Sequence, residues 1–129
     1  MKIQIKQINK KGRRKKDKMN VYDTANRLAT EIRQSEEYVN YKIAKQTLNL
    51  NTALKEKMAE FEKARYEVQI EMMQTGKNNE EKYKNVQKLY SELVENHEGK
   101  KYFEAETKFN ILIADVNKII GESIKDVLQ

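Results

Sequence analysis

The 129-residue sequence predicts an all-α protein built from long antiparallel amphipathic helices. Charged residues make up 36% of the chain and apolar residues 38%, a mixture typical of helices with one solvent-exposed face. Proline, which interrupts helices, is absent. Apolar residues recur at intervals of three and four positions, which places them on one side of a helix. These three observations favour a helical bundle or helical hairpin.

The first helix is predicted to begin near Tyr22, because apolar or small residues recur at helical spacing from there to Ile32. Asn20 or Asp23 is expected to cap its start, since either side chain can accept a backbone N–H of the first turn.

A second helix, or a kinked continuation of the first, is predicted to begin at Ser35 and to end near Leu48. The Ser35 hydroxyl can accept a backbone N–H, and Glu36 and Glu37 place negative charge at the positive end of the helix dipole.

The third helix is expected to extend from about Ala53 to Thr75, with Asn51 or Thr52 as its cap. Gly76 is expected to end it in the left-handed conformation that closes many helices.

The fourth helix is predicted from the helical spacing of apolar residues between Tyr83 and Leu93, followed by a frayed segment at residues 96–99. Asn78 and Glu81 have the spacing of a capping box at its start.

The last helix is predicted from about Lys101 to Val127 and is the most apolar. Three apolar residues lie off its main apolar stripe, namely Ile111, Ile113 and Ile120. In addition, a small number of helices of this length can enclose only a small interior. We therefore expect the bundle to be completed by oligomerisation, as a dimer or a larger assembly.

Positive charge is concentrated at the N-terminus. Residues 1–18 contain nine basic side chains and one acidic side chain, whereas residues 19–129 carry a net charge of −2. We predict a basic, disordered tail over residues 1–18 and a single helical domain over residues 19–129. The tail offers a nucleic-acid contact, because a basic arm can neutralise phosphates. The residues proposed for that contact are Arg13, Arg14, Lys15 and Lys16.

Two other interpretations of the tail stay open. It can be a solvated chain end without function. It can also lie upstream of the native start, because Met19 is followed at once by the first helical pattern.

The composition excludes most catalytic chemistry. Without Cys there is no disulfide, no thiolate metal site and no Cys nucleophile. His97 is the only imidazole, and we interpret it as a helix-end residue near a C-terminal dipole. The glycines are isolated, so no phosphate-binding loop is formed. The sequence thus indicates no catalytic residue, no metal site and no cofactor, and it predicts a protein that is not an enzyme.

Most aromatic residues fall on the apolar stripes and are expected to pack in the core. This group comprises Tyr22, Phe61, Tyr83, Tyr90, Tyr102 and Phe109. Tyr38, Tyr41 and Tyr66 fit these stripes less well and are candidates for a partner surface. No segment approaches the roughly 18–20 consecutive apolar residues of a membrane span, and no apolar signal region follows the first lysines. We expect a cytoplasmic protein without membrane contact.

Five segments, taken together in their order and spacing, carry a family resemblance. They are Val21–Ala25, Ser35–Tyr38, Met73–Gly76, Glu104–Glu106 and Ala114–Ile120. Over about residues 20 to 128 the chain resembles the YlbF/YmcA/YheA family of small helical bacterial proteins.

This resemblance implies a self-associating, non-catalytic regulatory adaptor. Its relatives regulate competence, sporulation and biofilm formation in Firmicutes and join a complex that assists a ribonuclease in maturing messenger RNA. The expected partners are a second copy, related family proteins and a ribonuclease complex. Some relatives hold iron–sulfur clusters through cysteines, which this chain lacks, so no cofactor is expected.

The residues expected to contact a protein partner lie at the start of the second helix and on the last helix. They are Ser35, Glu36, Glu37, Tyr38, Glu104 and Glu106. All six can equally be capping or surface residues. The alternative function is RNA or DNA binding through the basic tail.

Overall fold

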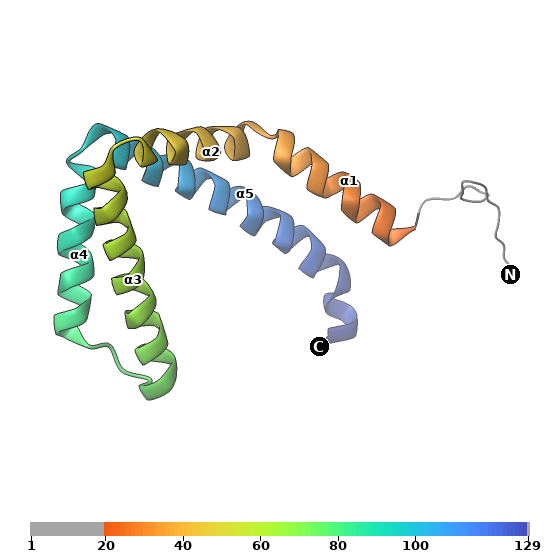
Figure 1. Cartoon of the computed structure of the whole chain (residues 1–129). Coiled ribbons are helices and arrows are strands. Elements are labelled where there is room, and N and C mark those ends of the chain that lie inside the picture. Colours follow the sequence, from red (N-terminus) through yellow and green to blue (C-terminus); the bar gives the residue numbers. More distant parts are fainter. Residues whose placement is uncertain (1–19, 129) are drawn as a thin grey trace, which may run out of the picture. The chain divides into compact units, whose positions relative to one another are not determined.

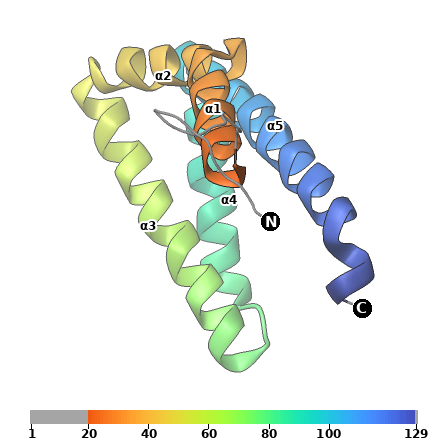
Figure 2. The same ribbon diagram turned by 90° about the vertical axis from the view of Figure 1, so that its right-hand side faces the viewer.

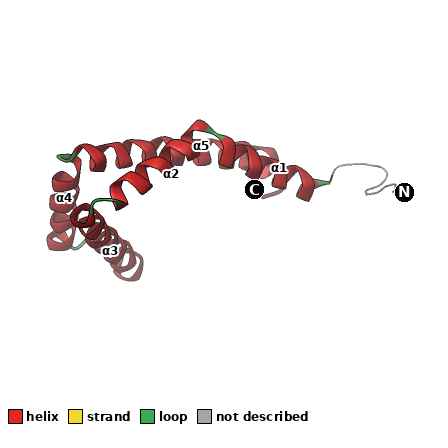
Figure 3. Cartoon of the chain, turned by 45° about the horizontal axis from the view of Figure 1, so that its top comes forward, coloured by secondary structure: helices red, strands yellow, loops and turns green. Residues whose placement is uncertain are grey.

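The computed structural model of the protein describes residues 20–128, and over this range it contains helices and no strand (Figures 1 and 3). The helices are α1 (Val21–Gln34), α2 (Glu36–Asn49), α3 (Thr52–Thr75), α4 (Glu80–Val94) and α5 (His97–Leu128). The all-α prediction is confirmed. The chain divides into two compact units, one ending at Tyr38 and one beginning at Val39. The predicted boundary at residues 18 and 19 lies outside the described residues and stays a prediction.

Asparagine side chains set most helix starts. Asn20, Asn51 and Asn79 each accept, through Oδ1, the backbone N–H of the third residue that follows, at 3.0, 3.1 and 3.1 Å. Each cap satisfies one of the N–H groups that the first turn leaves without a helical partner. The predicted cap of α4 at Asn78 is wrong by one residue. Gly76 ends α3 with a left-handed φ of 74°, as predicted, and its N–H donates to a carbonyl of the last turn at 2.8 Å.

The helix α5 begins four residues earlier than predicted. Asn96 Oδ1 accepts the backbone N–H of Glu98 at 3.0 Å, so helical structure starts at His97 rather than Lys101. The prediction that His97 lies near a C-terminal dipole is therefore wrong, because His97 occupies the first turn of α5.

The first unit consists of α1 and the first turn of α2. Ser35 separates the two helices and serves both, because its Oγ donates to the Ile32 carbonyl at 2.6 Å and accepts the Tyr38 N–H at 3.1 Å. The predicted cap at Ser35 is confirmed. No residue of α1 is fully buried.

The second unit is built on an antiparallel hairpin of α3 and α4, joined by residues 76–79 (Figure 2). Its core lies at the end of the hairpin that is distant from this connection, where the last turn of α2 and the start of α5 meet the hairpin. Leu48 and Leu93 are the most completely buried side chains. The core consists of Leu48, Leu54, Met58, Phe61, Leu89, Leu93, Tyr102 and Phe103.

Gly99 permits α5 to begin close against the end of α4. A Cβ atom on this residue would collide with the carbonyl oxygen of Leu93. Because glycine has no Cβ, the chain can turn from α4 into α5 within the two residues 95–96.

Two aromatic predictions are wrong. Tyr22 and Tyr83 lie on periodic apolar stripes, yet 78% and 44% of their surfaces are exposed. Tyr90 is 44% exposed, but its ring packs against the core residues Phe61 and Phe103, with centroid distances of 6.2 and 4.8 Å. Phe61 and Tyr102 are buried as predicted.

Candidate protein-interaction surface

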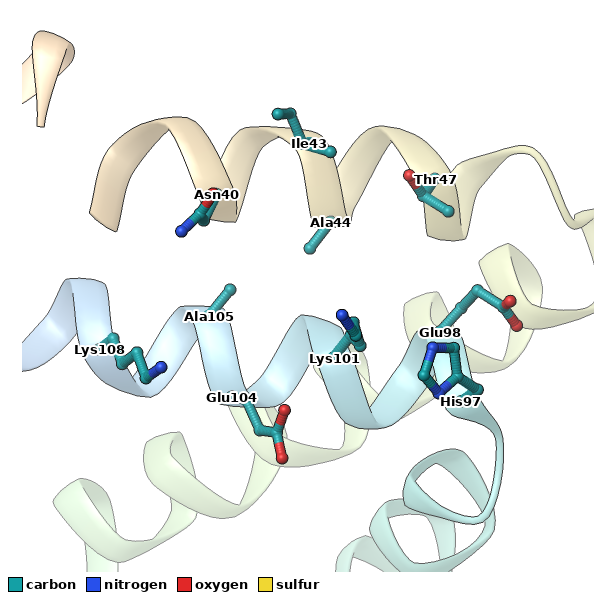
Figure 4. A pocket seen from close by; sticks show the side chains of 10 residues that line it. All are labelled: Asn40, Ile43, Ala44, Thr47, His97, Glu98, Lys101, Glu104, Ala105 and Lys108. Carbon is teal, nitrogen blue, oxygen red and sulfur yellow. The ribbon is translucent and has the colours of Figure 1, made fainter. Parts of the chain in front are cut away.

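A groove of about 450 Å³ lies between α2 and the first half of α5, which run antiparallel (Figure 4). The short side chains of Ala44 and Ala105 face each other across the gap, and Lys101 extends into it from α5. Ile43 points away from α5 and is exposed. The groove is lined by Asn40, Ile43, Ala44, Thr47, His97, Glu98, Lys101, Glu104, Ala105 and Lys108.

A polar cluster beside the groove holds α2 against α5. The hydroxyl oxygen of Tyr41 lies 3.3 Å from that of Tyr102, and Tyr41 donates to Glu106 Oε2 at 3.3 Å. The Tyr41 ring also packs between two aromatic rings of α5, with centroid distances of 5.5 Å to both Tyr102 and Phe109. Tyr41 is thus an internal packing residue, which differs from its predicted place on a partner surface.

Arg65 extends this cluster to α3. Its guanidinium donates to both carboxylate oxygens of Glu62 at 2.7 and 2.8 Å, and the same Nη2 lies 3.8 Å from Glu106 Oε2. The guanidinium carbon is also 5.1 Å from the centre of the Phe61 ring, a cation–π distance. Charged and polar groups of three helices are therefore connected in one network.

Three groups of this network have raised pKa values. Burial raises the pKa of Tyr102, and its hydrogen bond to Tyr41 and the charge of Glu106 raise it further. Burial also raises the pKa of Tyr41, although the Tyr102 hydrogen bond opposes this shift. For Arg65, burial lowers the pKa, but the hydrogen bond and charge of Glu62 outweigh it and the net shift is upward. At neutral pH the two tyrosines therefore stay neutral and Arg65 stays charged.

The two predicted contact residues of α5 have different surroundings. Glu104 is exposed and lines the groove. The Glu106 side chain is only 15% exposed, because it faces Tyr41 and Arg65. Residues two positions apart on a helix differ by about 200° in direction, which explains why only Glu104 is available to a partner.

The four predicted contact residues of α2 are gathered at its start. Ser35 caps the helix, Glu36 is exposed in the first turn, and Glu37 is half-buried. The Arg33 guanidinium lies 5.5 Å from the centre of the half-buried Tyr38 ring. The predicted nucleic-acid contacts at residues 13–16 lie outside the described residues. The partner-binding roles of all these residues stay predictions.

The second half of α5 carries an apolar stripe that continues the one packed against α2. From Phe109 onward, apolar residues follow at steps of three and four positions. Ile113 and Val116 are half-buried, whereas Ile120, Ile124 and Val127 are exposed. Ile113 and Ile120, which were predicted to lie off the main apolar stripe, lie on this face of the helix. Ile111 lies on the opposite side from Ile120, because nine residues span two and a half turns.

Within residues 20–128, no group of three or more His, Asp and Glu side chains is arranged to hold a metal ion. In the same range, every helix is too short or too polar to cross a membrane.

Comparison with known proteins identifies the relatives of the chain. The family model described as the control of competence regulator ComK, YlbF/YmcA, matches residues 21–125. A UPF0342 protein of Desulfitobacterium hafniense is 34% identical over 110 residues, which cover 85% of this chain and 89% of the relative.

Three solved structures share the fold, each over 84% of this chain. A DUF964 protein of Bacillus stearothermophilus has a TM-score of 0.73 and 17% sequence identity, and 96% of its chain is covered. YheA of Bacillus subtilis has a TM-score of 0.63 and 22% identity, and 99% of its chain is covered. RicA of Bacillus subtilis, solved in complex with RicF, has a TM-score of 0.56 and 20% identity, and 96% of its chain is covered. Residues 20–128 form five helices, and the family match covers most of the chain. The chain therefore belongs to the family of the control of competence regulator ComK, YlbF/YmcA, as its resemblance to YlbF/YmcA/YheA proteins predicted.

Proposed function

We propose that this protein is a non-catalytic regulatory adaptor that acts through protein–protein contacts, with a second copy or related family proteins as partners. The observation that carries the proposal is the apolar stripe on the second half of α5. Ile120, Ile124 and Val127 share one helix face, and 48%, 44% and 80% of their surfaces are exposed. An exposed apolar helix face is a typical site for a partner helix.

The comparisons support this proposal in two ways. The family model carries the description of a competence regulator. RicA, which has a similar fold, was solved in complex with RicF. For this chain we assign such a contact to the apolar stripe of α5, because Ile120, Ile124 and Val127 are exposed on one helix face.

The proposal extends to the cellular role. We place the protein in a cytoplasmic complex that assists ribonuclease-dependent maturation of messenger RNA and so controls competence, sporulation or biofilm formation. The description of the family model as a competence regulator supports the competence part of this role. Affinity purification of the tagged full-length chain from its native cells should recover a ribonuclease, and recovery of family proteins alone would argue against this extension.

The adaptor proposal is tested by size-exclusion chromatography with light scattering. The Ile120→Ser, Ile124→Ser double variant should lose association with itself or with family proteins of the same genome. Ile111→Ser is the matched control, because Ile111 is 56% exposed on the opposite side of the same helix. Association that survives the double substitution, or a wild-type chain that is monomeric and binds no family protein, would contradict the proposal.

A second candidate function is RNA or DNA binding through residues 1–18, favoured by nine basic side chains in that segment. Binding should weaken steeply with salt, because counterions are released when lysine and arginine neutralise phosphates. It should also disappear when residues 1–18 are deleted. Binding that persists in a chain starting at Met19 would exclude the tail as the contact.

A further inference from the structure

The groove between α2 and α5 combines a narrow apolar floor with two cations. Ala44 and Ala105 are half-buried and face each other, so their short side chains leave the space between the helices open. The volume of about 450 Å³ is within the range of about 300–1,000 Å³ that is typical of binding clefts. A large apolar side chain can therefore enter the gap between the two alanines.

Lys101 and Lys108 lie at this groove on the same helix, seven residues and about 10.5 Å apart along its axis. Both are exposed, and neither takes part in an ion pair among residues 20–128. The carboxylate of Glu104, which lies between them in sequence, points away from α2 (Figure 4). The two ammonium groups are thus available to carboxylates of a ligand that lies along the groove.

The remaining charge argues for a protein ligand. Glu98 also lines the groove. A polyphosphate chain would meet this carboxylate as well as the lysines, and like charges repel. A helix can instead place individual carboxylates opposite the two lysines and leave a neutral residue opposite Glu98.

We propose that this groove binds an amphipathic helix of a partner protein, in which two acidic residues seven positions apart flank a large apolar residue. The acidic residues pair with Lys101 and Lys108, and the apolar residue inserts between Ala44 and Ala105. Residues at i, i+4 and i+7 share one helix face, so a single helix can present all three groups. The inference rests on the proposed adaptor function but uses a surface separate from the apolar stripe of α5.

The test uses a fluorescent peptide of about 18 residues, longer than the roughly 12–15 below which isolated helices are marginal. It carries Glu, Leu and Glu at i, i+4 and i+7 on an Ala/Gln background, and the control peptide carries Lys in place of both Glu. Fluorescence anisotropy with the full-length protein should show binding of the acidic peptide. The Lys101→Glu, Lys108→Glu double variant should weaken it by at least about tenfold.

Two variants complete the design. Ala105→Leu fills the gap and should weaken binding to a similar extent. Lys118→Glu changes an exposed lysine of α5 outside the groove and should leave affinity unchanged. If circular dichroism shows that Ala105→Leu is unfolded, the double lysine variant alone decides the outcome.

Several results would overturn the inference. They are failure of the acidic peptide to bind, equal binding of the Lys peptide, and affinity that the groove variants leave unchanged. Displacement of the peptide by single-stranded RNA from a chain that lacks residues 1–18 would assign the groove to nucleic acid and would also overturn it. The Ile120→Ser, Ile124→Ser variant should keep wild-type peptide affinity, so the adaptor proposal and this inference can fail separately.

Discussion

The hydroxyl oxygens of Tyr41 and Tyr102 lie 3.3 Å apart, although 61 positions separate the two residues in sequence. Since an ionised Glu106 can only accept, Tyr41 must donate its proton to that carboxylate, and Tyr102 then donates to the Tyr41 oxygen. This chain of hydrogen bonds joins α2 to α5 and orients both rings.

Removing the Tyr102 hydroxyl tests the contribution of this chain. Tyr102→Phe should lower the free energy of unfolding by about 1 kcal/mol, because Tyr41 loses a buried donor while the ring packing is kept. Urea unfolding followed by circular dichroism measures the change. Tyr83→Phe is the control, since Tyr83 is 44% exposed, and an equal loss in both variants would contradict the prediction.

The same pair predicts a dependence of stability on alkaline pH. The folded-state pKa of Tyr102 is raised above its ordinary value of about 10, mainly by burial, so its contribution is fully present below pH 10. Above about pH 10 the unfolded chain releases the phenolic proton first, and stability falls as the pH rises toward the folded-state pKa. The stability advantage of wild type over Tyr102→Phe should therefore shrink as the pH rises above about 10. Lysines titrate in both proteins, so their effects cancel. A difference that stays constant above pH 10 would contradict the prediction.

Two glycines of α5 should respond in opposite directions to alanine. Gly99→Ala should destabilise the protein by about 1–3 kcal/mol, because the new Cβ collides with the Leu93 carbonyl oxygen and forces α4 and α5 apart. Gly121→Ala should stabilise it by up to about 1 kcal/mol, because no atom lies within 4 Å of the new Cβ and alanine favours helix. Thermal unfolding of both variants measures the contrast. If Gly99→Ala leaves the thermal stability unchanged, the close approach of α4 and α5 is not required for the stability of the fold.

Ser35 allows a capping role to be separated from a partner contact. Ser35→Ala should cost about 1 kcal/mol, because the Tyr38 N–H loses its acceptor. Ser35→Asp restores an acceptor and should recover most of this stability. If Ser35→Asp recovers stability but not association with family proteins, the hydroxyl itself contacts the partner; recovery of both would limit Ser35 to capping.

Helix positions could be predicted from the sequence because their signals are local. Each of these signals depends only on neighbours within one or two helical turns. They are the cap at Ser35, the left-handed turn at Gly76 and the helical spacing of apolar residues. The start of α5 is an exception, because Asn96 lies in a segment predicted to fray, yet its Oδ1 accepts the backbone N–H of Glu98 and helical structure begins at His97.

The polar network could not be predicted, because its partners are distant in sequence. Tyr41 gave no local signal for its contact with Tyr102, and Arg65 gave only the local spacing of its pair with Glu62. Periodicity shows which side of a helix is apolar but not whether another helix covers it. That is why Tyr83, predicted as a core residue, is exposed.

The position of the core at the start of α5 has a mechanical consequence. Phe103 is the last buried residue of this helix, and Phe109 still packs against Tyr41 of α2. The 19 residues that follow Phe109 extend the helix by about 28 Å, at a rise of 1.5 Å per residue. A tilt of about 5° at Phe109 therefore moves the far end of α5, which carries Ile124 and Val127, by about 2.5 Å.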